Sequence, residues 1–208
     1  MRVREFAGGD FDSASKLLGA TWHAEHGRQA YWQGADELCD HLSRSDVGFV
    51  VEDDGGSLLG VALYAGTSET PHNDTLRMHW LQQRTRLAAM AKALGIDARA
   101  DVSLLNDEHE LVQKGLEQAG VHKAGEVVLV IVSPQARGLG VGSALLQAGL
   151  SWLASQGAEV VCLVTDDACD WQFYEHLGMR RTLQGYATHD ADFGLYVYEA
   201  SVEELLHA

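Results

Sequence analysis

The pattern of apolar and polar positions along the chain predicts seven strands interspersed with helices. Short apolar runs bounded by turn residues are typical of strands, whereas apolar residues spaced three or four apart are typical of helices. The predicted strands cover residues 2–6, 47–51, 58–64, 127–132, 160–164, 180–186 and 194–199. The predicted helices cover residues 10–18, 35–42, 76–94, 106–119, 145–156 and 170–177.

Turn and stop signals define several of these boundaries. The turn sequence Asp53-Asp-Gly-Gly56 separates two strand-like runs and predicts a β-hairpin. Asp10 is expected to cap the N-terminus of the first helix, and the helix predicted at residues 106–119 is expected to begin at Asn106. A turn at residues 189–192 is expected between the last two strands. The glycines expected to end helices are Gly95, Gly120, Gly157 and Gly178.

The order of these elements indicates α/β architecture with a mixed sheet. Strand, helix, strand and helix follow one another in the second half, and two strands close the chain. Residues 67–125 are different, because two helices are inserted there between the third and fourth strands. A chain of 208 residues is long enough for one domain that carries such an insertion.

The charge balance excludes one class of partner and favours another. The chain has 15 basic and 30 acidic residues, which gives a net charge of −15. Nucleic-acid binding depends on Lys and Arg that neutralise phosphates, so neither nucleic acid nor an anionic membrane is an expected partner. The acidity weakly favours a cationic or amine-bearing partner, although a solubilising acidic surface is the simpler explanation.

The cysteines and the first residues indicate a cytoplasmic protein. Cys39, Cys162 and Cys169 are odd in number and form no CxxC pair, which is typical of free thiols in a reducing compartment. The first ten residues contain no apolar segment of the kind found in signal peptides. The longest apolar run is far shorter than the ~18 residues that suggest a membrane span.

The strongest chemical signal is a run of glycines at the start of a helix. Gly138, Gly140 and Gly142 follow the predicted strand 127–132, and Arg137 precedes them. Glycine destabilises a helix by up to ~1 kcal/mol relative to alanine, so bare backbone must serve another purpose here. Free N–H groups at a helix N-terminus bind anions, and phosphate or pyrophosphate is the natural ligand. Neither the P-loop triplet nor the spacing of a dinucleotide-binding loop is present.

The segment instead resembles the acyl-CoA loop of the GNAT superfamily of N-acetyltransferases. The matching positions of its V-x-P-x-x-R-x-x-G-x-G-x-x-L-L pattern are Val132, Pro134, Arg137, Gly140, Gly142, Leu145 and Leu146. A second matching segment follows at residues 173–179, Phe-Tyr-Glu-His-Leu-Gly-Met. The resemblance covers residues 126–180 and implies a mixed, mostly antiparallel sheet flanked by helices. It further implies a single acetyltransferase domain over residues 1–208, with the 67–125 insertion inside it.

The resemblance also implies how acetyl-CoA, the co-substrate, would be bound. The pantetheine would bond to the backbone of Val130, Ile131 and Val132. The pyrophosphate would meet the backbone N–H groups of Arg137, Gly138, Leu139, Gly140, Val141 and Gly142, with Ser143 nearby. No metal is implied.

The catalytic groups are assigned by the same resemblance. Tyr174 matches the position of the family's proton donor, since a phenol can protonate a departing thiolate; packing of helix on sheet is the alternative role. Glu126 matches a position where relatives carry an acidic residue and is a candidate general base. Two interpretations of Glu126 remain open: a carboxylate whose pKa is raised by the adjoining apolar residues Val127 and Val128, or an ordinary solvated carboxylate at a strand start.

Aspartates before the tyrosine helix are a further candidate contact. Asp167 lies where many relatives have an asparagine, and it is assigned to the coenzyme-binding set. A carboxylate cannot donate the amide hydrogen bond, so Asp166 and Asp167 are alternatively candidates to hold a cationic acceptor.

The predicted function is transfer of acetyl from acetyl-CoA to a primary amine by direct attack, the acceptor being a small molecule or a peptide. A catalytically weak acyl-CoA-binding module with the same fold is the alternative. His23 and His26 lack a third metal ligand and are interpreted as a polar helix face. The insertion, with Arg77 and His79, is a candidate lid or homodimer contact. The tryptophans interpreted as core residues or as an acceptor pocket are Trp22, Trp32 and Trp80.

Overall fold

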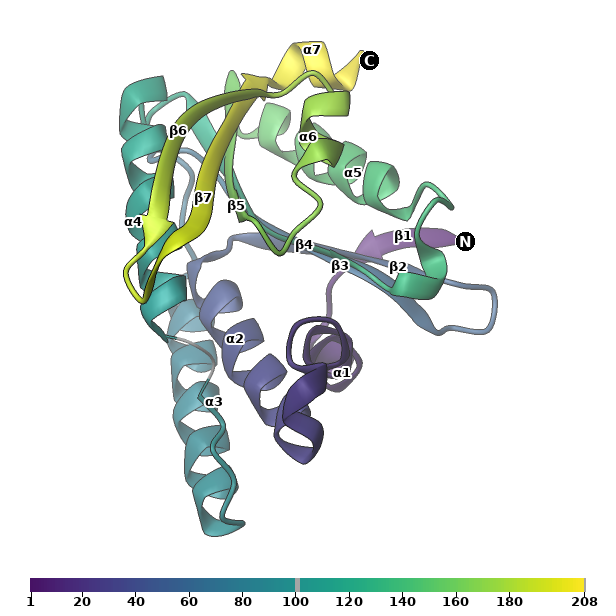
Figure 1. The fold of residues 1–208 in the computed structure, drawn as a ribbon. Helices are drawn as coiled ribbons and strands as arrows, with labels where there is room; N and C mark the ends of the chain where they lie inside the picture. The colour runs from purple at the N-terminus through teal and green to yellow at the C-terminus, as the bar shows by residue number, and fades with distance from the viewer. Residues whose placement is uncertain (100–101, 208) are drawn as a thin grey trace. The chain divides into compact units, whose positions relative to one another are not determined.

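The computed structural model describes residues 1–99 and 102–207, and each predicted strand and helix is present (Figure 1). The strands are β1 (Arg2–Glu5), β2 (Val47–Glu52), β3 (Leu58–Ala65), β4 (Ala124–Val132), β5 (Val160–Asp166), β6 (Arg180–Ala187) and β7 (Asp190–Ser201). The α-helices are α1 (Phe11–Trp22), α2 (Ala30–Arg44), α3 (Asp74–Ala93), α4 (Val102–Ala119), α5 (Val141–Ser155), α6 (Gln172–His176) and α7 (Val202–Leu206). Within this described part of the chain, no helix is both long and apolar enough to cross a membrane.

The strands form one mixed sheet in the order β1-β2-β3-β4-β5-β7-β6. Strands β1 and β2 pair antiparallel, as do β5 with β7 and β6 with β7. Strands β4 and β5 are parallel, and residues 124–127 pair with 160–163. Helices α3 and α4 lie between β3 and β4 in the sequence. The expected mixed, mostly antiparallel sheet with a two-helix insertion is therefore confirmed.

Six predicted boundaries are wrong by three residues or more, and packing explains two of them. Helix α1 ends at Trp22 rather than at residue 18, α2 begins at Ala30 rather than at residue 35, and α5 begins at Val141 rather than at residue 145. Helix α4 begins at Val102 rather than at Asn106, because Leu105 is already buried and extends the apolar face. Strand β4 begins at Ala124 rather than at Val127. Its first residues are small because a Cβ at Gly125 would lie 2.5 Å from the side chain of Leu153. Strand β7 begins at Asp190, so part of the predicted turn at 189–192 is strand.

The described chain divides into two compact units. The first comprises residues 1–63, 72–99 and 129–149, and the second comprises 64–71, 102–128 and 150–207. Helix α3 belongs to the first unit together with α1 and α2, whereas α4 belongs to the second. The two helices of the predicted insertion are thus parts of different units.

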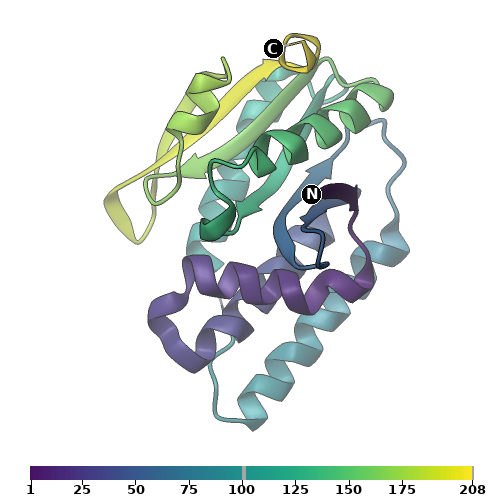
Figure 2. The same ribbon diagram turned by 90° about the vertical axis from the view of Figure 1, so that its right-hand side faces the viewer.

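In the first unit, α1 and α2 pack side by side with their backbones in close contact (Figure 2). A Cβ on Gly34 would lie 2.4 Å from the backbone N of Gly19, so the crossing requires glycine. Helix α3 packs against the other side of α2. Trp80 of α3 is 7% exposed and stacks on Phe11 of α1 at a ring separation of 5.5 Å. Trp80 is therefore a core residue, whereas Trp22 is half-buried.

In the second unit, α4 covers one face of β5, β6 and β7. Val112 and Leu116 of α4 form a buried cluster with Ala124 and Cys162 of the sheet. Small residues bring the helix close, since a Cβ on Gly115 would lie 2.7 Å from the side chain of Val197.

The three cysteines are free thiols, as expected for a chain without disulfides. Cys39 and Cys162 are fully buried, and Cys169 is half-buried. Burial raises the pKa of both Cys39 and Cys162 to about 12 and also raises the pKa of Cys169.

Candidate active site

The glycine loop of the first unit has the backbone conformation of an open turn into a helix. Strand β4 runs into a 3₁₀ turn at Pro134–Ala136, and α5 starts at Val141. Gly138 and Gly140 adopt φ of +76° and +78°, which costs other L-residues about 1–2 kcal/mol. A Cβ at either glycine would meet nothing within 4 Å. Backbone conformation, and not crowding inside the protein, therefore requires these glycines, and the space beside them is open.

The N–H groups at the start of α5 are available as anion donors. The first N–H groups of an α-helix have no partner within the helix, and here they belong to Val141, Gly142 and Ser143. The helical ladder starts when Ala144 N–H donates to Gly140 O at 2.9 Å. The helix dipole adds positive potential at this end.

Two predicted donors of the loop are used within the loop itself. The N–H of Arg137 donates to Pro134 O at 3.4 Å, and the N–H of Leu139 donates to Ala136 O at 3.3 Å. The side chains of Arg137 and Leu139 are both exposed. The Arg137 guanidinium is thus an exposed cationic group beside the loop.

A hydrogen bond and close packing hold the backbone next to the glycine loop in place. Ser133 N–H donates to Leu59 O at 2.8 Å, directly after the end of β4. A Cβ on Gly60 would lie 2.9 Å from both Ile131 O and the Val141 side chain, so β3 approaches the strand and the helix closely. Ile131 is buried, whereas Val130 and Val132 on either side of it are half-buried.

Tyr174 of the second unit is a protonated phenol in a largely apolar place. It lies on the short helix α6, and its ring is 5.4 Å from Phe173 and 6.0 Å from Tyr198. Burial raises the pKa of Tyr174 above its ordinary value near 10, and Cys169, Asp170 and Asp166 add to the rise. The hydroxyl therefore carries its proton at neutral pH and can donate it.

Glu126 is buried, so its interpretation as a solvated carboxylate at a strand start is wrong. It is the third residue of β4 and is only 6% exposed. Paired residues of neighbouring strands project to the same face, and Glu126 pairs with Cys162, which pairs with Glu199. This is the sheet face that α4 covers, because Cys162 packs against that helix.

Glu126 and Tyr174 lie on opposite faces of the sheet in the second unit. Tyr198, which contacts the Tyr174 ring, is next to Glu199 in β7 and so projects to the other face. The structure does not bring the two predicted catalytic groups into contact, so a proton cannot pass directly between them.

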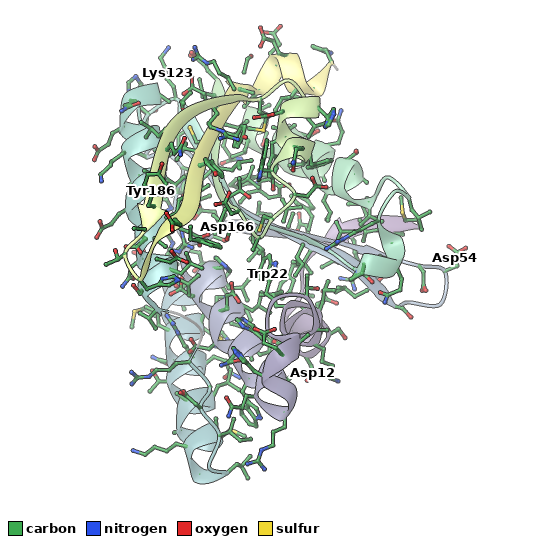
Figure 3. All side chains as sticks on the ribbon, viewed as in Figure 1. Asp12, Trp22, Asp54, Lys123, Asp166 and Tyr186 are labelled. Atoms are coloured by element: carbon green, nitrogen blue, oxygen red, sulfur yellow. The ribbon has the colours of Figure 1, made fainter. Side chains whose placement is uncertain are left out.

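Asp166 is the last residue of β5 (Figure 3), Asp167 follows it, and their carboxylates have different hydrogen-bond partners. Asp166 is 8% exposed and accepts hydrogen bonds from the N–H groups of Ala168 and Cys169. Burial raises its pKa.

Both oxygens of Asp167 are engaged by β7. They accept hydrogen bonds from Tyr196 Oη at 2.6 Å and from Gly194 N at 2.7 Å. The bond from Tyr196, followed by that from Gly194, lowers the pKa of Asp167. Asp167 therefore fixes the end of β5 onto β7, and its contact with the coenzyme stays a prediction.

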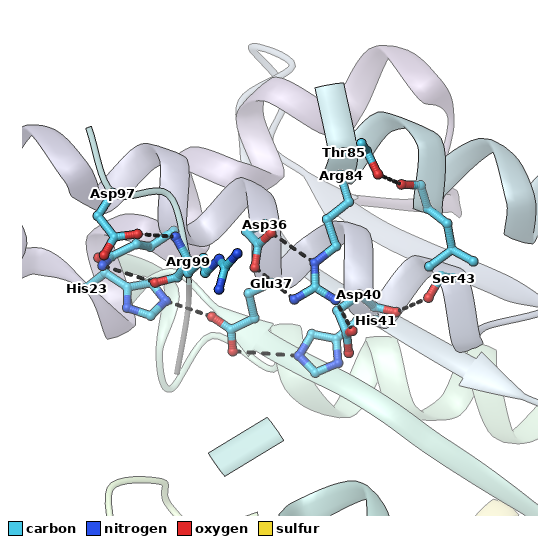
Figure 4. A network of polar contacts seen from close by, with 12 residues as sticks. His23, Asp36, Glu37, Asp40, His41, Ser43, Arg84, Thr85, Asp97 and Arg99 are labelled. Carbon is cyan, nitrogen blue, oxygen red and sulfur yellow. Dashed lines mark hydrogen bonds and ion pairs between the residues drawn. The ribbon is translucent and has the colours of Figure 1, made fainter. Parts of the chain in front are cut away.

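A buried polar network on α2 was not recognised in the sequence (Figure 4). Glu37 is 8% exposed and lies between His23 Nε2, at 2.7 Å, and His41 Nε2, at 3.6 Å. On the neighbouring side of α2, Arg84 binds both oxygens of Asp36 at 2.9 Å and Asp40 at 2.5 Å. The spacing of Glu37 and His41, one helical turn apart, was the available signal.

The two histidines interpreted as a polar helix face lie in different environments. His23 caps the C-terminus of α1 and binds Glu37, whereas His26 lies in the following 3₁₀ turn and contacts Gln33 at 2.5 Å. Among the described residues, no group of three or more His, Cys, Asp or Glu side chains is placed to hold a metal ion.

The environment of Glu37 predicts a pH-dependent stability. Burial alone would raise the pKa of Glu37, but hydrogen bonds from His23 and His41 lower it to about 2. The folded-state pKa lies below the ordinary value of 4.5, so the stabilisation is present above that value and lost as the pH falls towards 2. The free energy of unfolding, measured with urea, should therefore fall more steeply over this range in the wild type than in Glu37→Gln.

The exposed carboxylate of Glu203 on α7 provides the control for this experiment. The Glu203→Gln variant should keep the wild-type dependence on pH. A parallel decline of the wild type and Glu37→Gln would contradict the role assigned to Glu37.

Comparison with known proteins identifies similar sequences and structures. A family model described as the Acetyltransferase (GNAT) family matches residues 11–179. A segment of 59 residues is 46% identical to the mycothiol acetyltransferase of Thermobispora bispora, covering 27% of this chain and 20% of that protein. The chain therefore matches about a fifth of the length of this curated relative.

Solved structures show the same fold at low sequence identity. An aminoglycoside 6′-N-acetyltransferase complexed with coenzyme A is 15% identical, with 97% of both chains covered and a TM-score of 0.58. The aminoglycoside 6′-N-acetyltransferase from Enterococcus faecium is also 15% identical over 97% of both chains, with a TM-score of 0.57.

Proposed function

The chain belongs to the GNAT acetyltransferase family, and on this premise we propose that it transfers acetyl from acetyl-CoA to the primary amine of a small molecule. The observation that carries the proposal is the open N-terminus of α5, where Gly138 and Gly140 leave the helix N–H groups uncovered. A pyrophosphate is the anion that such an end, with Arg137 beside it, suits best.

The residues of the loop fit the coenzyme expected of the family. Acetyl-CoA supplies the acetyl group in activated form, as a thioester. The N–H groups of Val141, Gly142 and Ser143 would hold the pyrophosphate, together with Gly138 and Gly140 and the Arg137 side chain. The backbone of Val130, Ile131 and Val132 would hold the pantetheine in the manner of an added strand.

Tyr174 would supply the proton that the leaving thiolate needs. Its raised pKa keeps the hydroxyl protonated at neutral pH, and a protonated phenol can transfer its proton to sulfur as the bond to carbon breaks. The proton moves from Tyr174 Oη to the sulfur, and solvent then returns a proton to the phenolate.

Glu126 would act as the general base: through an intervening water it takes a proton from the acceptor's ammonium group, and the neutral amine then attacks the thioester carbon. Its burial in β4 is consistent with this role, and its position on the sheet face opposite Tyr174 separates the base from the acid. General-base catalysis contributes about 10²–10⁴-fold to rates. We therefore expect Glu126→Gln to lower kcat/KM by about 10²-fold or more and to remove the acidic limb of its pH profile.

The control for this experiment is Glu199→Gln. Glu199 lies on the same face of the sheet, separated from Glu126 by Cys162, and forms an ion pair with Arg180. This variant should keep the wild-type pH profile. An unchanged profile for Glu126→Gln would overturn its assignment and point to Asp166 or to an acceptor that arrives uncharged.

The acceptor is proposed to be a small cationic amine. The net charge of −15 favours the approach of a cation, and the aminoglycoside acetyltransferases that share this fold modify amino groups. Polyamines, amino acids and aminoglycosides form the test panel, with a peptide N-terminus as the macromolecular comparison.

The test is acetyl-CoA-dependent release of free thiol in the presence of each amine, with mass spectrometry of the product. Acetylation of at least one small amine is expected. Tight binding of acetyl-CoA without thiol release from any amine would contradict the proposal and favour an acyl-CoA-binding module.

A further inference from the structure

Arg181 of β6 lies in a box of aromatic rings beside the helix that carries Tyr174. Its guanidinium carbon is 3.9 Å from the ring centroid of Tyr196, 4.8 Å from that of Trp171 and 5.3 Å from that of Tyr198. Planar guanidinium stacks favourably on aromatic faces, and partly buried contacts are stabilised further. The side chain joins α6 to both closing strands, since Trp171 is the N-cap of α6 and the tyrosines belong to β7.

The same guanidinium takes part in a hydrogen-bond network with Tyr198 and Glu175. Arg181 Nε and Nη2 donate to Tyr198 Oη at 3.0 and 2.7 Å. Tyr198 Oη in turn donates to Glu175 Oε1 at 2.8 Å, and Arg181 Nη2 lies 3.3 Å from the same oxygen. The Tyr198 ring, which carries the shared hydroxyl, is fully buried.

These contacts hold α6 on both sides of Tyr174. Trp171 precedes Tyr174 by three residues, and Glu175 follows it directly. Helix α6 has only five residues. So short a helix is not stable by itself, because the loss of conformational entropy in forming the first turn outweighs the stabilisation by its few hydrogen bonds. The position of Tyr174 therefore depends on the contacts that Arg181 makes with the residues around it.

The network also distinguishes the two neighbouring phenols. The rings of Tyr174 and Tyr198 are 6.0 Å apart, so either hydroxyl is a chemically reasonable proton donor. Tyr198 accepts two bonds from a permanent cation, and its single proton is therefore directed to Glu175. Within the described part of the chain, the hydrogen bonds of this network join only Arg181, Tyr198 and Glu175, and the Tyr174 hydroxyl is not among them.

We propose that Arg181 is a positioning residue for the transfer reaction: it holds α6 against the closing strands and directs the Tyr198 proton to Glu175. Tyr174 is then the phenol that protonates the leaving thiolate. The inference rests on the proposed acetyltransferase function and adds a group that does not itself touch the reacting atoms.

Arg181→Lys tests the proposal, because lysine keeps the charge and loses the planar fork. Misplacement of a catalytic group by about 1 Å can cost about 10²-fold in rate. We expect kcat to fall by about 10- to 100-fold, whereas the dissociation constant for acetyl-CoA, measured by calorimetry, changes by less than about twofold. Tyr198→Phe, which keeps the buried ring and removes only the oxygen, should reproduce part of this loss.

Arg180→Lys is the matched control. Arg180 is the adjacent residue of β6, is exposed, and pairs with Glu199 rather than with α6. It should keep the wild-type kcat. Thermal unfolding of each variant tests whether it is folded.

A double-mutant cycle separates positioning from a general structural effect. If Arg181 acts through Tyr174, Arg181→Lys should lower kcat far less in the Tyr174→Phe background than in the wild type. The same fold loss in both backgrounds would overturn the proposal, as would a wild-type kcat for Arg181→Lys.

A readout without turnover keeps this inference separate from the proposed function. Hydrogen exchange of the α6 amides should be faster in Arg181→Lys than in the wild type and unchanged in Arg180→Lys. Unaltered α6 protection in Arg181→Lys would overturn the positioning role. An inactive wild type that still shows the faster exchange would instead overturn the acetyltransferase function.

Discussion

Replacing Tyr174 by phenylalanine is expected to lower kcat by about 10²- to 10⁴-fold, the range for loss of a general acid. The dissociation constant for acetyl-CoA should change by less than about twofold, because the variant lacks only the hydroxyl. The ring contacts with Phe173 and Tyr198 are kept, so α6 should stay in place. Steady-state thiol release gives kcat, and calorimetry gives the affinity.

Tyr186→Phe is the control for this substitution. Tyr186 lies in the same unit and is 58% exposed on β6, where its oxygen accepts a hydrogen bond from Gln184. Its loss should leave kcat unchanged. A wild-type kcat for Tyr174→Phe would show that another group donates the proton.

The pH profile of the wild type follows from the same hydroxyl. A group that must be protonated stops working as the pH rises through its pKa, and burial raises the pKa of Tyr174 above 10. The alkaline limb of kcat should accordingly lie above pH 10 and be absent from the residual activity of Tyr174→Phe.

Gly140→Asp is expected to weaken acetyl-CoA binding by about 10- to 100-fold, which corresponds to about 1.4–2.7 kcal/mol. The new carboxylate would stand at the N-cap of α5, where a negative charge is favourable and can accept from the first N–H groups. An internal anion would thus compete for the donors proposed to hold the pyrophosphate. Calorimetry at two salt concentrations measures the loss.

Gly157→Asp provides a closely matched control at the other end of the same helix. Gly157 has φ of +82°, and a Cβ there also meets nothing within 4 Å. The backbone strain is therefore similar, but no anion site is expected beside it. Equal affinity for acetyl-CoA in Gly140→Asp and the wild type would show that the N-terminus of α5 does not bind the pyrophosphate.

The glycine loop could be predicted from the sequence because its causes are local. Positive φ at Gly138 and Gly140 restricts those positions almost entirely to glycine, and Pro134 marks the end of a strand by lacking an N–H group. These effects of glycine and proline on the backbone are the same wherever the rest of the chain lies. The strands and most helices were predictable for the same reason, since their apolar spacing is a property of short segments.

The burial of Glu126 could not be predicted in this way. Its neighbours in the sequence are apolar on one side only, and a carboxylate near the start of a strand normally faces solvent. It is buried in a sheet whose same face is covered by α4, a helix placed there by Val112 and Leu116. Which face of a strand a distant helix covers is decided by tertiary packing and leaves no local pattern.

The network around Glu37 was missed because α2 is buried on both sides. Polar residues one turn apart on a helix normally mark its solvent face. Here α1 and α3 pack on α2, so Glu37 and His41 are enclosed and find partners in each other and in His23. The aromatic box of Arg181 was missed for a related reason, since Trp171 and Tyr196 belong to different elements.

The burial of the cysteines has a practical consequence for detecting the reaction product. Aromatic disulfide reagents that report free CoA react with thiolates, and burial raises the pKa of Cys39 and Cys162 to about 12, well above the pH of such an assay. Cys39 and Cys162 are further shielded because they are fully buried. Cys169 is only half-buried, but burial raises its pKa as well. The three thiols should therefore add little background colour, and absorbance can follow turnover continuously without first blocking them.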